Sequence, residues 1–336
     1  MVSFREITLQ RIGEESAPSR IWMVSWHYSG NFLASCGDDK AVRIWTFNQD
    51  SKPHLDCRTT LDDSHTRTIR CVNFSHCGKL LASSSFDASI VIYQQEDGDY
   101  SEVNKLEGHE SEVKWCAFSP SDEFLATCSR DKSVWFWQVD EDDDFNVSSI
   151  LQPHTQDVKF VVWHPNEDLL VSCSYDFSIR FFRYDGEDWV TQQKIDKAHD
   201  GTVWSAAFDA DGHRLITVGE DHVIQIWRRE NVGAKSATAD TWKSVAKYLV
   251  EDTRWPLYSV SWNHVTGLVA TAGGDSKIRI FQVAGSADDE RIEPLGVWSG
   301  HDGEVNCVAW CPAADKANIL ASASDDGSVR LLQVEL

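Results

Sequence analysis

Histidine, a hydroxyl residue and aspartate recur together along this chain, and these are the residue types of a hydrolase triad. The set is clearest at His109, Thr127 and Asp131. A triad needs one nucleophile, one base and one oxyanion site at an open pocket. Because the set returns in copy after copy, at most one copy could be catalytic. A buried aspartate in a tight turn accepts hydrogen bonds from backbone N–H groups, histidine and hydroxyls, so we expect a structural role and no enzymatic activity.

The spacing of the aspartates defines a repeat that covers the chain. Successive repeat aspartates are 44 to 54 residues apart, a period typical of β-propeller blades. The seven are Asp39, Asp87, Asp131, Asp176, Asp221, Asp275 and Asp326. A histidine precedes five of them by 22 or 25 residues, namely His65, His109, His154, His199 and His301. The first and sixth copies carry Ala17 and Thr253 at the histidine position.

Short apolar runs between these markers predict the strands. Residues 79–83 and 89–93 form such runs, bounded by turn residues, and residues 99–106 follow a polar hairpin. The last copy lacks an outer strand, whereas residues 3–9 alternate in polarity and have no blade of their own. We therefore expect this N-terminal strand to complete the last blade and close the ring.

The pattern resembles the WD40 repeat over the full chain. The resemblance implies an all-β, seven-bladed WD40 β-propeller, and we expect residues 1–336 to form this single domain. Two features depart from the family, because no strand ends in Trp-Asp and, of the five repeat histidines, only His109 and His301 follow a glycine. The regular aspartates and hydroxyl residues outweigh these departures.

Composition excludes several classes of function. The net charge of −22 disfavours nonspecific binding to nucleic acid or to anionic membranes. The N-terminus lacks the pattern of a signal peptide, and no apolar run reaches the length of a membrane-spanning helix. Nine cysteines without a C-x-x-C pair predict reduced thiols, with Cys36, Cys128 and Cys173 in the core. We expect a cytoplasmic protein without a bound metal or cofactor.

The positions at which the copies differ predict a binding surface. The turns with the repeat aspartates must share one end of the ring with the histidine loops, and we call this end the top. Two sets of positions should face it: the residue before each aspartate and the residue four before each innermost aromatic. They give a basic arc of Arg70, Lys114, Arg130 and Lys159, beside the aromatics Phe86, Tyr175, Trp204, Tyr258 and Trp22. Arginine with aromatics is typical of interface hot spots, so we expect an acidic, aromatic peptide end or partner loop there.

The opposite end, the bottom, should be acidic. The hairpins between third and fourth strands contain acidic runs at 96–99, 140–144, 185–188 and 288–290. Solvation and solubility explain such runs by themselves. The longest insertion, 228–250, should hold the outer strand of blade five around 242–249, after a Gly/Ala/Ser-rich loop.

Several stretches resemble one subfamily more closely. They include LASCGDDKAVRIW at 33–45, LATCSRDKSVWFW at 125–137 and HTQDVKFVVWHP at 154–165. These are similar to the WD40 subunit of the cytosolic iron–sulfur protein assembly machinery. The resemblance implies a non-enzymatic scaffold in the targeting complex that delivers clusters to cytosolic and nuclear apo-proteins. The implied partners are a MIP18-type (DUF59) protein, a HEAT-repeat targeting subunit, an iron-only-hydrogenase-like cluster carrier and apo iron–sulfur clients, whose tails often end in an aromatic residue.

The same resemblance singles out one arginine. The functionally important top-face arginine of that family falls on Arg130, and arginine binds a carboxylate through two hydrogen bonds. Our hypothesis is that Arg130 holds a terminal carboxylate or acidic side chain, with Lys114, Lys159 and Tyr175 lining the pocket. By itself the chain should be monomeric. Alternatives are a chromatin or ubiquitin-ligase adaptor reading a basic tail near Asp38, Glu220 and Asp325, and, third, a propeller enzyme.

Overall fold

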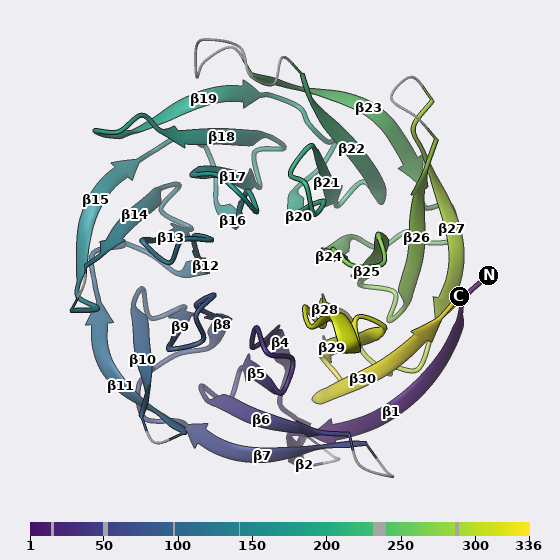
Figure 1. Ribbon diagram of the computed structural model, residues 1–336, viewed down its shortest axis with the longest axis horizontal. Coiled ribbons are helices and arrows are strands. Elements are labelled where there is room, and N and C mark those ends of the chain that lie inside the picture. The colour runs from purple at the N-terminus through teal and green to yellow at the C-terminus, as the bar shows by residue number, and fades with distance from the viewer. Residues whose placement is uncertain (15–16, 50–52, 97, 141, 231–239, 286–288) are drawn as a thin grey trace.

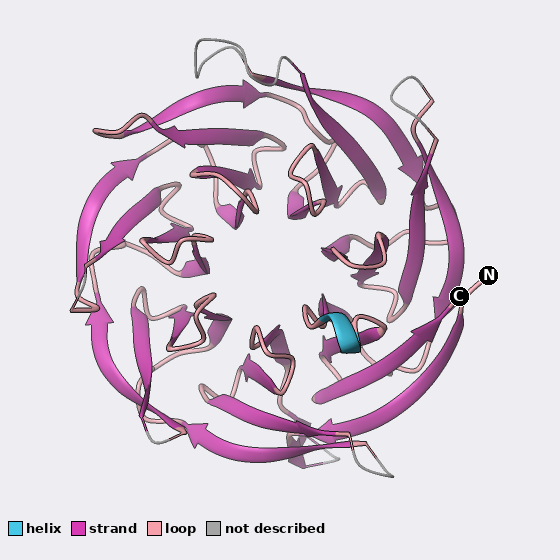
Figure 2. Cartoon of the chain, in the orientation of Figure 1, coloured by secondary structure: helices cyan, strands magenta, loops and turns pink. Residues whose placement is uncertain are grey.

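Seven antiparallel sheets form a ring around a central channel in the computed structural model (Figure 1). It describes residues 1–336 except 15–16, 50–52, 97, 141, 231–239 and 286–288. Each sheet has four strands, the first innermost, and is one blade. Strands make up almost all of the regular structure (Figure 2). The seven-bladed propeller predicted from the repeat is confirmed.

The first four blades follow the chain in order. Blade one contains β4 (Ile21–Trp26), β5 (Phe32–Gly37), β6 (Val42–Asn48) and β7 (His54–Leu61). Blade two contains β8 (Ile69–Phe74), β9 (Leu80–Ser85), β10 (Ile90–Glu96) and β11 (Asp99–Leu106). Blade three contains β12 (Val113–Phe118), β13 (Phe124–Ser129), β14 (Val134–Val139) and β15 (Phe145–Leu151). Blade four contains β16 (Val158–Trp163), β17 (Leu169–Ser174), β18 (Ile179–Tyr184) and β19 (Trp189–Ile195).

The remaining blades complete the ring. Blade five contains β20 (Val203–Phe208), β21 (Arg214–Gly219), β22 (Val223–Glu230) and β23 (Thr241–Leu249). Blade six contains β24 (Leu257–Trp262), β25 (Leu268–Gly273), β26 (Ile278–Ala284) and β27 (Arg291–Trp298). Blade seven contains β28 (Val305–Trp310), β29 (Ile319–Ser324), β30 (Ser328–Glu335) and β1 (Ser3–Arg11). Two short pieces remain, the hairpin of β2 (Gly13–Glu14) with β3 (Ala17–Pro18) and the 3-10 turn η1 (Ala314–Lys316).

The N-terminal strand closes the ring as expected. β1 pairs antiparallel with β30, with Ser3 opposite Glu335 and Arg11 opposite Ser328, so the two termini lie side by side (Figure 1). The strand is two residues longer than the sequence predicted. The backbone N–H of Val2 also donates to the carbonyl of Leu295 in β27, at 3.1 Å, which ties the N-terminus to blade six. This pairing leaves no open gap between the first and last blades.

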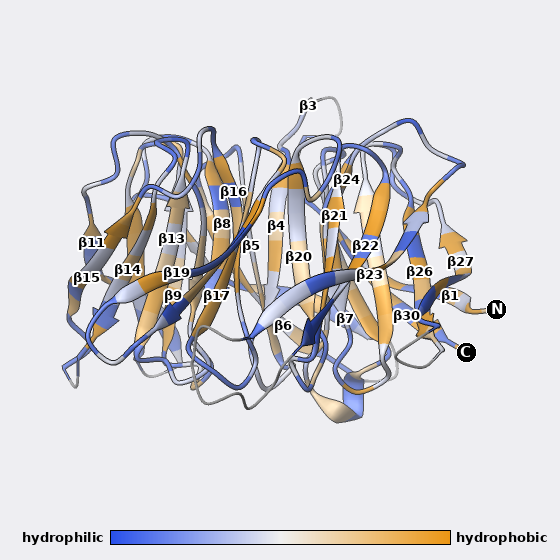
Figure 3. Cartoon of the chain, turned by 90° about the horizontal axis from the view of Figure 1, so that it is seen from above, coloured by the Kyte–Doolittle hydropathy of each residue, from blue (hydrophilic) through white to orange (hydrophobic). Residues whose placement is uncertain are grey.

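The core lies between neighbouring blades. Each second strand is packed on both faces, and β9, β13, β17, β25 and β29 are buried at every residue. Outer strands alternate between buried and exposed side chains. Large aromatics fill the wedge between blades, as where Trp189 stacks on Phe136 with ring centroids 4.1 Å apart. Hydrophobic segments accordingly follow the strands, and hydrophilic ones gather in the loops at both ends (Figure 3).

A buried hydrogen-bond chain holds the top turn in five blades. In blade three, Trp137 Nε1 donates to Thr127 Oγ1 at 3.0 Å, and Thr127 Oγ1 lies 2.8 Å from His109 Nε2. His109 Nδ1 donates to Asp131 Oδ2 at 2.8 Å. The distances from histidine to aspartate and to hydroxyl are equally short, 3.0 Å or less, in blades two, four, five and seven. Each chain of hydrogen bonds therefore connects a strand, through the histidine loop, to the turn that contains the repeat aspartate.

Arginine replaces histidine in the other two blades. In blade six, Arg279 binds Asp275 with an N–O distance of 2.5 Å and also reaches Asp252 at 2.9 Å. In blade one, Arg43 forms an ion pair with Asp39 at 2.5 Å. Both arginines stand four residues after the repeat aspartate, and in blade seven, which keeps its histidine, Arg330 reaches Asp326 from the same position at 3.4 Å.

The residue after each repeat aspartate has a left-handed backbone. Its φ lies between 57° and 74° in all seven turns: Lys40, Ala88, Lys132, Phe177, His222, Ser276 and Gly327. Only the last is glycine, so six turns accept a conformation that costs about 1–2 kcal/mol for other residues. The aspartate side chain supports this turn by accepting a hydrogen bond from the N–H two residues later, as Asp131 does from Ser133 at 2.9 Å.

Among the described residues, no helix has the length and hydropathy needed to cross a membrane.

Candidate binding surface on the top face

A β-bulge explains how seven side chains reach the top of the channel. The ladder between first and second strands skips one residue in every blade. The skipped residues are Trp22, Arg70, Lys114, Lys159, Trp204, Tyr258 and Asn306. A bulge re-aims a side chain that strict alternation would send elsewhere. It therefore turns these seven side chains toward one another around the channel.

The cations of the basic arc rest on aromatic rings. Arg70 lies over Trp22, with its guanidinium carbon 4.9 Å from the ring centroid. Lys114 Nζ lies 4.1 Å from the centroid of Phe86. Lys159 Nζ lies 5.2 Å from Tyr175. Such contacts are worth about 0.5–1 kcal/mol at exposed sites and hold the cations without neutralising them.

The two lysines of the arc influence each other. Burial first, and then the charge of Lys159, lower the pKa of Lys114 to about 8. Glu112 and Asp157 oppose this shift only in part. A bound anion would relieve the repulsion, so the pair favours a negatively charged ligand.

Arg130 lies in a shallow pocket at the junction of blades two and three. Its Nη1 is 3.3 Å from Glu112 Oε1, and Arg67 Nη2 lies 3.3 Å from the same oxygen. Burial alone would raise the pKa of Glu112, but hydrogen bonding by Ser111 and the nearby cations lower it to about 2. The pocket has a volume of about 420 Å³ and includes Phe86. Two guanidiniums thus share one carboxylate.

The geometry of the Arg130 contact leaves it available to a ligand. Its distance to Glu112 exceeds the roughly 2.7–2.9 Å of a strong charge-assisted bond. The Arg130 side chain is 58% exposed, against 13% for Glu112. A second carboxylate could therefore approach Arg130 from solvent while Glu112 keeps Arg67.

The candidate residues fall into two neighbouring groups. Phe86 brings Arg130 and Lys114 together, whereas Lys159 lies with Tyr175 and Trp204. Trp204 continues to Tyr258, whose ring meets it edge-on at 5.2 Å. The arrangement is a track along blades one to six, in which the Arg130 pocket and the cluster of Lys159, Tyr175 and Trp204 are separate parts.

The far side of the top face is acidic. Asp38 accepts from Trp22 Nε1 at 2.7 Å, and Asp325 binds Asn306 at 2.7 Å. Glu220 accepts from the Thr202 hydroxyl at 2.8 Å. Burial first, and then the carboxylate of Glu304, raise the pKa of the Tyr258 phenol well above its ordinary value. Asp38, Asp325 and Glu220 therefore accept hydrogen bonds from neighbouring side chains of the protein itself.

Three contributors to the site were missed from the sequence. Arg67 lies outside the two positional rings, and its contacts with Glu112 and Phe86 assign it to the pocket. Trp115 and Phe160 stand three residues before the innermost aromatic, where other blades carry Met23, Cys71, Ser205, Ser259 and Cys307. Their rings meet at 4.3 Å and narrow the channel beneath Lys114 and Lys159. The larger side chains at these two positions can be recognised when the seven copies of the repeat are compared.

Metal chemistry has little support in the cysteines and acids that the structure describes. All nine cysteines are free, with Cys36, Cys128 and Cys173 buried as the repeat positions predicted. Cys71 and Cys116 approach most closely among the contacts observed, with sulfurs 3.8 Å apart. Within the described ranges, no three His, Cys, Asp or Glu side chains gather as metal ligands would.

Comparison with known proteins agrees with the repeat. The family described as WD40, "WD domain, G-beta repeat", matches residues 9–46, 55–94, 100–138, 145–183, 190–228 and 292–332. A relative from Caenorhabditis elegans, named probable cytosolic iron-sulfur protein assembly protein CIAO1 homolog, is 67% identical and covers 96% of this chain and 97% of its own. The chain belongs to this WD40 family.

Other members of the family support the same relationship. A Culex quinquefasciatus relative, probable cytosolic iron-sulfur protein assembly protein Ciao1, is 43% identical over 94% of this chain and 95% of its own. A Meyerozyma guilliermondii relative, probable cytosolic iron-sulfur protein assembly protein 1, is 36% identical over 93% and 96%. The matched repeats skip 229–291, which contains β24 to β26 of blade six, one of the two blades with arginine in place of histidine. The subfamily resemblance noted in the sequence is thereby confirmed.

Proposed function

We propose that this chain is a non-enzymatic scaffold of cytosolic iron–sulfur protein assembly. It acts in the targeting complex that delivers clusters to cytosolic and nuclear apo-proteins, and it works in the cytoplasm and nucleus. The observation that carries the proposal is the 67% identity over 96% of the chain to a relative named for cytosolic iron–sulfur protein assembly. The cluster is cargo of the complex and is held by other subunits or clients.

The top face recognises the acidic, aromatic tail of a client or adaptor. Arg130 binds the terminal carboxylate or an acidic side chain, and Lys114 adds a second charge across Phe86. Tyr175 and Trp204, which flank Lys159, take the aromatic side chain. Recognition by a planar guanidinium distinguishes carboxylates by shape as well as by charge.

The co-subunits are a MIP18-type (DUF59) protein, a HEAT-repeat targeting subunit and an iron-only-hydrogenase-like cluster carrier. An affinity purification with quantitative mass spectrometry tests this assembly, using wild type, Arg130→Glu and the remote surface variant Lys247→Glu. We expect co-subunits with all three baits, and clients to be lost selectively from Arg130→Glu. Absence of iron–sulfur proteins from the wild-type purification would refute the assembly role.

A binding assay tests the tail pocket directly. A fluorescent peptide with an acidic residue and a C-terminal tryptophan is compared with its C-terminal amide. We expect Arg130→Glu to weaken the free acid by at least about tenfold, since charged pairs are worth 2–5 kcal/mol when one partner is lost. Arg130→Lys should recover only part of the affinity. Equal binding of acid and amide by the wild-type protein would reject the carboxylate pocket.

A further inference from the structure

The bottom of the channel is a separate cavity. It has a volume of about 490 Å³ and is lined by all seven blades' inner strands or their turns. Trp115 and Phe160, whose rings are 4.3 Å apart, line it on the side of blades three and four. Above Trp115 lies Arg70, with its guanidinium carbon 5.9 Å from the ring. On this side of the channel, the basic arc therefore lies above the two aromatics and the cavity lies below them.

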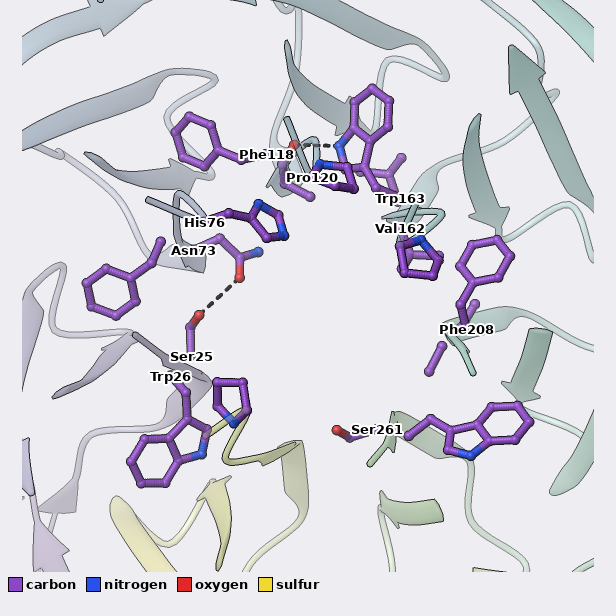
Figure 4. A pocket seen from close by; sticks show the side chains of 18 of the residues that line it. Ser25, Trp26, Asn73, His76, Phe118, Pro120, Val162, Trp163, Phe208 and Ser261 are labelled. Atoms are coloured by element: carbon purple, nitrogen blue, oxygen red, sulfur yellow. Dashed lines mark hydrogen bonds between the residues drawn. The ribbon is translucent and has the colours of Figure 1, made fainter. Parts of the chain in front are cut away.

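The wall of the cavity is mostly apolar, although Ser75, His76 and Ser261 also line it. Trp26 and Trp163 each donate their indole N–H to a carbonyl of the preceding blade, at 3.0 and 2.8 Å. Val162 lies on the wall between Trp163 and Phe208 (Figure 4). Ser25 donates to Asn73 at 3.1 Å, so these polar side chains bind each other within the wall (Figure 4). A preformed apolar cavity binds an apolar side chain without first rearranging.

The mouth of the cavity exposes apolar side chains to solvent. Tyr28 is 65% exposed, and Pro120, Pro165 and Pro312 belong to the same turns that line the opening. Exposed apolar rims around a hollow mark interaction sites. The position of these turns, at the end opposite the repeat aspartates, separates them from the basic arc.

An acidic collar lies at this end of the ring, partly on the turns beside the mouth and partly on the hairpins at the outer edge (Figure 1). The turns between first and second strands and the hairpins between third and fourth strands all reach this end of the ring. Exposed carboxylates on them include Glu123, Asp142, Asp144, Asp185, Glu187, Asp211 and Asp315. Two lysines at this end are already engaged, because Lys79 binds Asp143 and Lys316 binds the carbonyl of Gly30 and the side chain of Asn31. The collar attracts cations and repels the acidic tails that suit the top face.

We infer that the bottom mouth docks a positively charged segment of a protein partner, with one large apolar side chain inserted into the cavity. The apolar side chain fills the space below Trp115 and Phe160, while lysines or arginines face the collar. The opposite charges of the two ends let two partners of different chemistry bind at the same time. This site is independent of the tail pocket proposed at Arg130.

Two synthetic peptides provide the test. Each has the sequence Lys-Lys-X-Lys-Lys, with X either tryptophan or alanine, and binding to the full chain is measured by fluorescence anisotropy. We expect the tryptophan peptide to bind at least about tenfold more tightly, and p-benzoylphenylalanine at X to crosslink to residues lining the cavity. Equal affinity of the two peptides, or crosslinks confined to the top or outer wall, would overturn the proposal.

Variants separate the cavity from the collar. Val162→Lys should abolish the preference for tryptophan, whereas Val297→Lys, at a half-exposed valine of the outer wall, should leave it intact. The double variant Asp142→Lys/Asp144→Lys should weaken both peptides and keeps the inference testable if Val162→Lys fails to fold. Arg130→Glu should change neither affinity. Tight binding by Glu-Glu-Trp-Glu-Glu, or a wild-type dimer abolished by Val162→Lys, would contradict a basic partner.

Discussion

Blades three and six solve the same structural problem with different chemistry. In blade three, His109 connects Asp131 to the strand hydroxyl of Thr127, and its side chain is fully buried. In blade six, Arg279 binds Asp275 and Asp252, and the latter carboxylate is 52% exposed. The blade fold therefore needs a cation or N–H donor for its aspartate, but no particular residue. The neighbouring top-face positions differ, being Arg130 and Lys114 in blade three but Gly274 and Tyr258 in blade six.

The largest expected effect is loss of stability in blade three. Asp131 accepts from His109, from the N–H groups of Glu110 and Ser133, and from the Ser133 hydroxyl. Asp131→Ala leaves these donors unpaired and should lower the free energy of unfolding by about 3–4 kcal/mol. Asp275→Ala should cost only about 2 kcal/mol, since Arg279 retains Asp252. Urea denaturation followed by tryptophan fluorescence measures both.

That ranking has a clear counter-result. If Asp275→Ala lowers the free energy of unfolding as much as Asp131→Ala does, the exposed Asp252 does not stabilise Arg279. The arginine contact of blade six and the histidine contact of blade three then contribute equally to stability. The double variant Asp275→Ala/Asp252→Ala should then add nothing further.

The aspartate of blade three should also make stability depend on pH. Burial alone would raise the pKa of Asp131, but hydrogen bonds from His109 and Ser133 hold it well below its ordinary value of 3.8. A depressed pKa stabilises the fold above the ordinary value, and this contribution is lost as pH falls. Asp131→Asn should therefore be about 2 kcal/mol less stable than wild type near neutral pH, with the gap closing below pH 3.8.

Denaturation curves at a series of pH values test this linkage. If the difference in stability between wild type and Asp131→Asn stays constant into strong acid, the charge of the Asp131 carboxylate contributes nothing to stability. Asp142→Asn, at an exposed bottom carboxylate, serves as the control.

A smaller effect concerns Lys114, the bulge residue of blade three, whose equivalent in blade six is Tyr258. With a pKa of about 8, Lys114 is charged at neutral pH and loses its charge in mildly alkaline solution. Affinity for an acidic, aromatic tail peptide should therefore fall about fivefold to tenfold between about pH 7 and pH 9.5. Lys114→Arg, which stays charged, should bind with a flat pH profile. If wild type also shows a flat profile, Lys114 does not contact the anion.

The repeat pattern predicted the fold because its markers report backbone geometry. A buried aspartate in each turn and an aromatic at each strand end fix the blades, and alternation in residues 3–9 identified the closing strand. Side-chain neighbours were harder to predict. Arg67 reaches Glu112 across a blade boundary, and Arg279, on a strand, takes the place of a histidine that other blades carry in a loop. Such contacts depend on how adjacent blades meet, which periodicity does not encode.

The bulge illustrates the same limit. Alternation from the innermost aromatic would place Lys114 away from Trp115 and Ala117, yet the skipped position turns it into the channel. Comparison of equivalent positions in the seven copies identified Lys114 as a top-face residue, but it did not explain why the Lys114 side chain points into the channel. The charge of the acidic hairpins was likewise readable, but the residues at 97, 141 and 288 lie outside those described, as does the loop at 231–239.

The smallest expected effect tests what blades three and six share. Lys132 and Ser276 follow their aspartates with φ of 74° and 64°, a conformation that glycine adopts without steric cost. Lys132→Gly and Ser276→Gly should each raise the free energy of unfolding by about 0.5–1 kcal/mol, because relief of this strain exceeds the added entropy of the unfolded chain. Lys132→Ala is the matched control and should change little. A gain in blade three but not in blade six would show that the arginine tie, unlike the histidine tie, depends on the side chain within the turn.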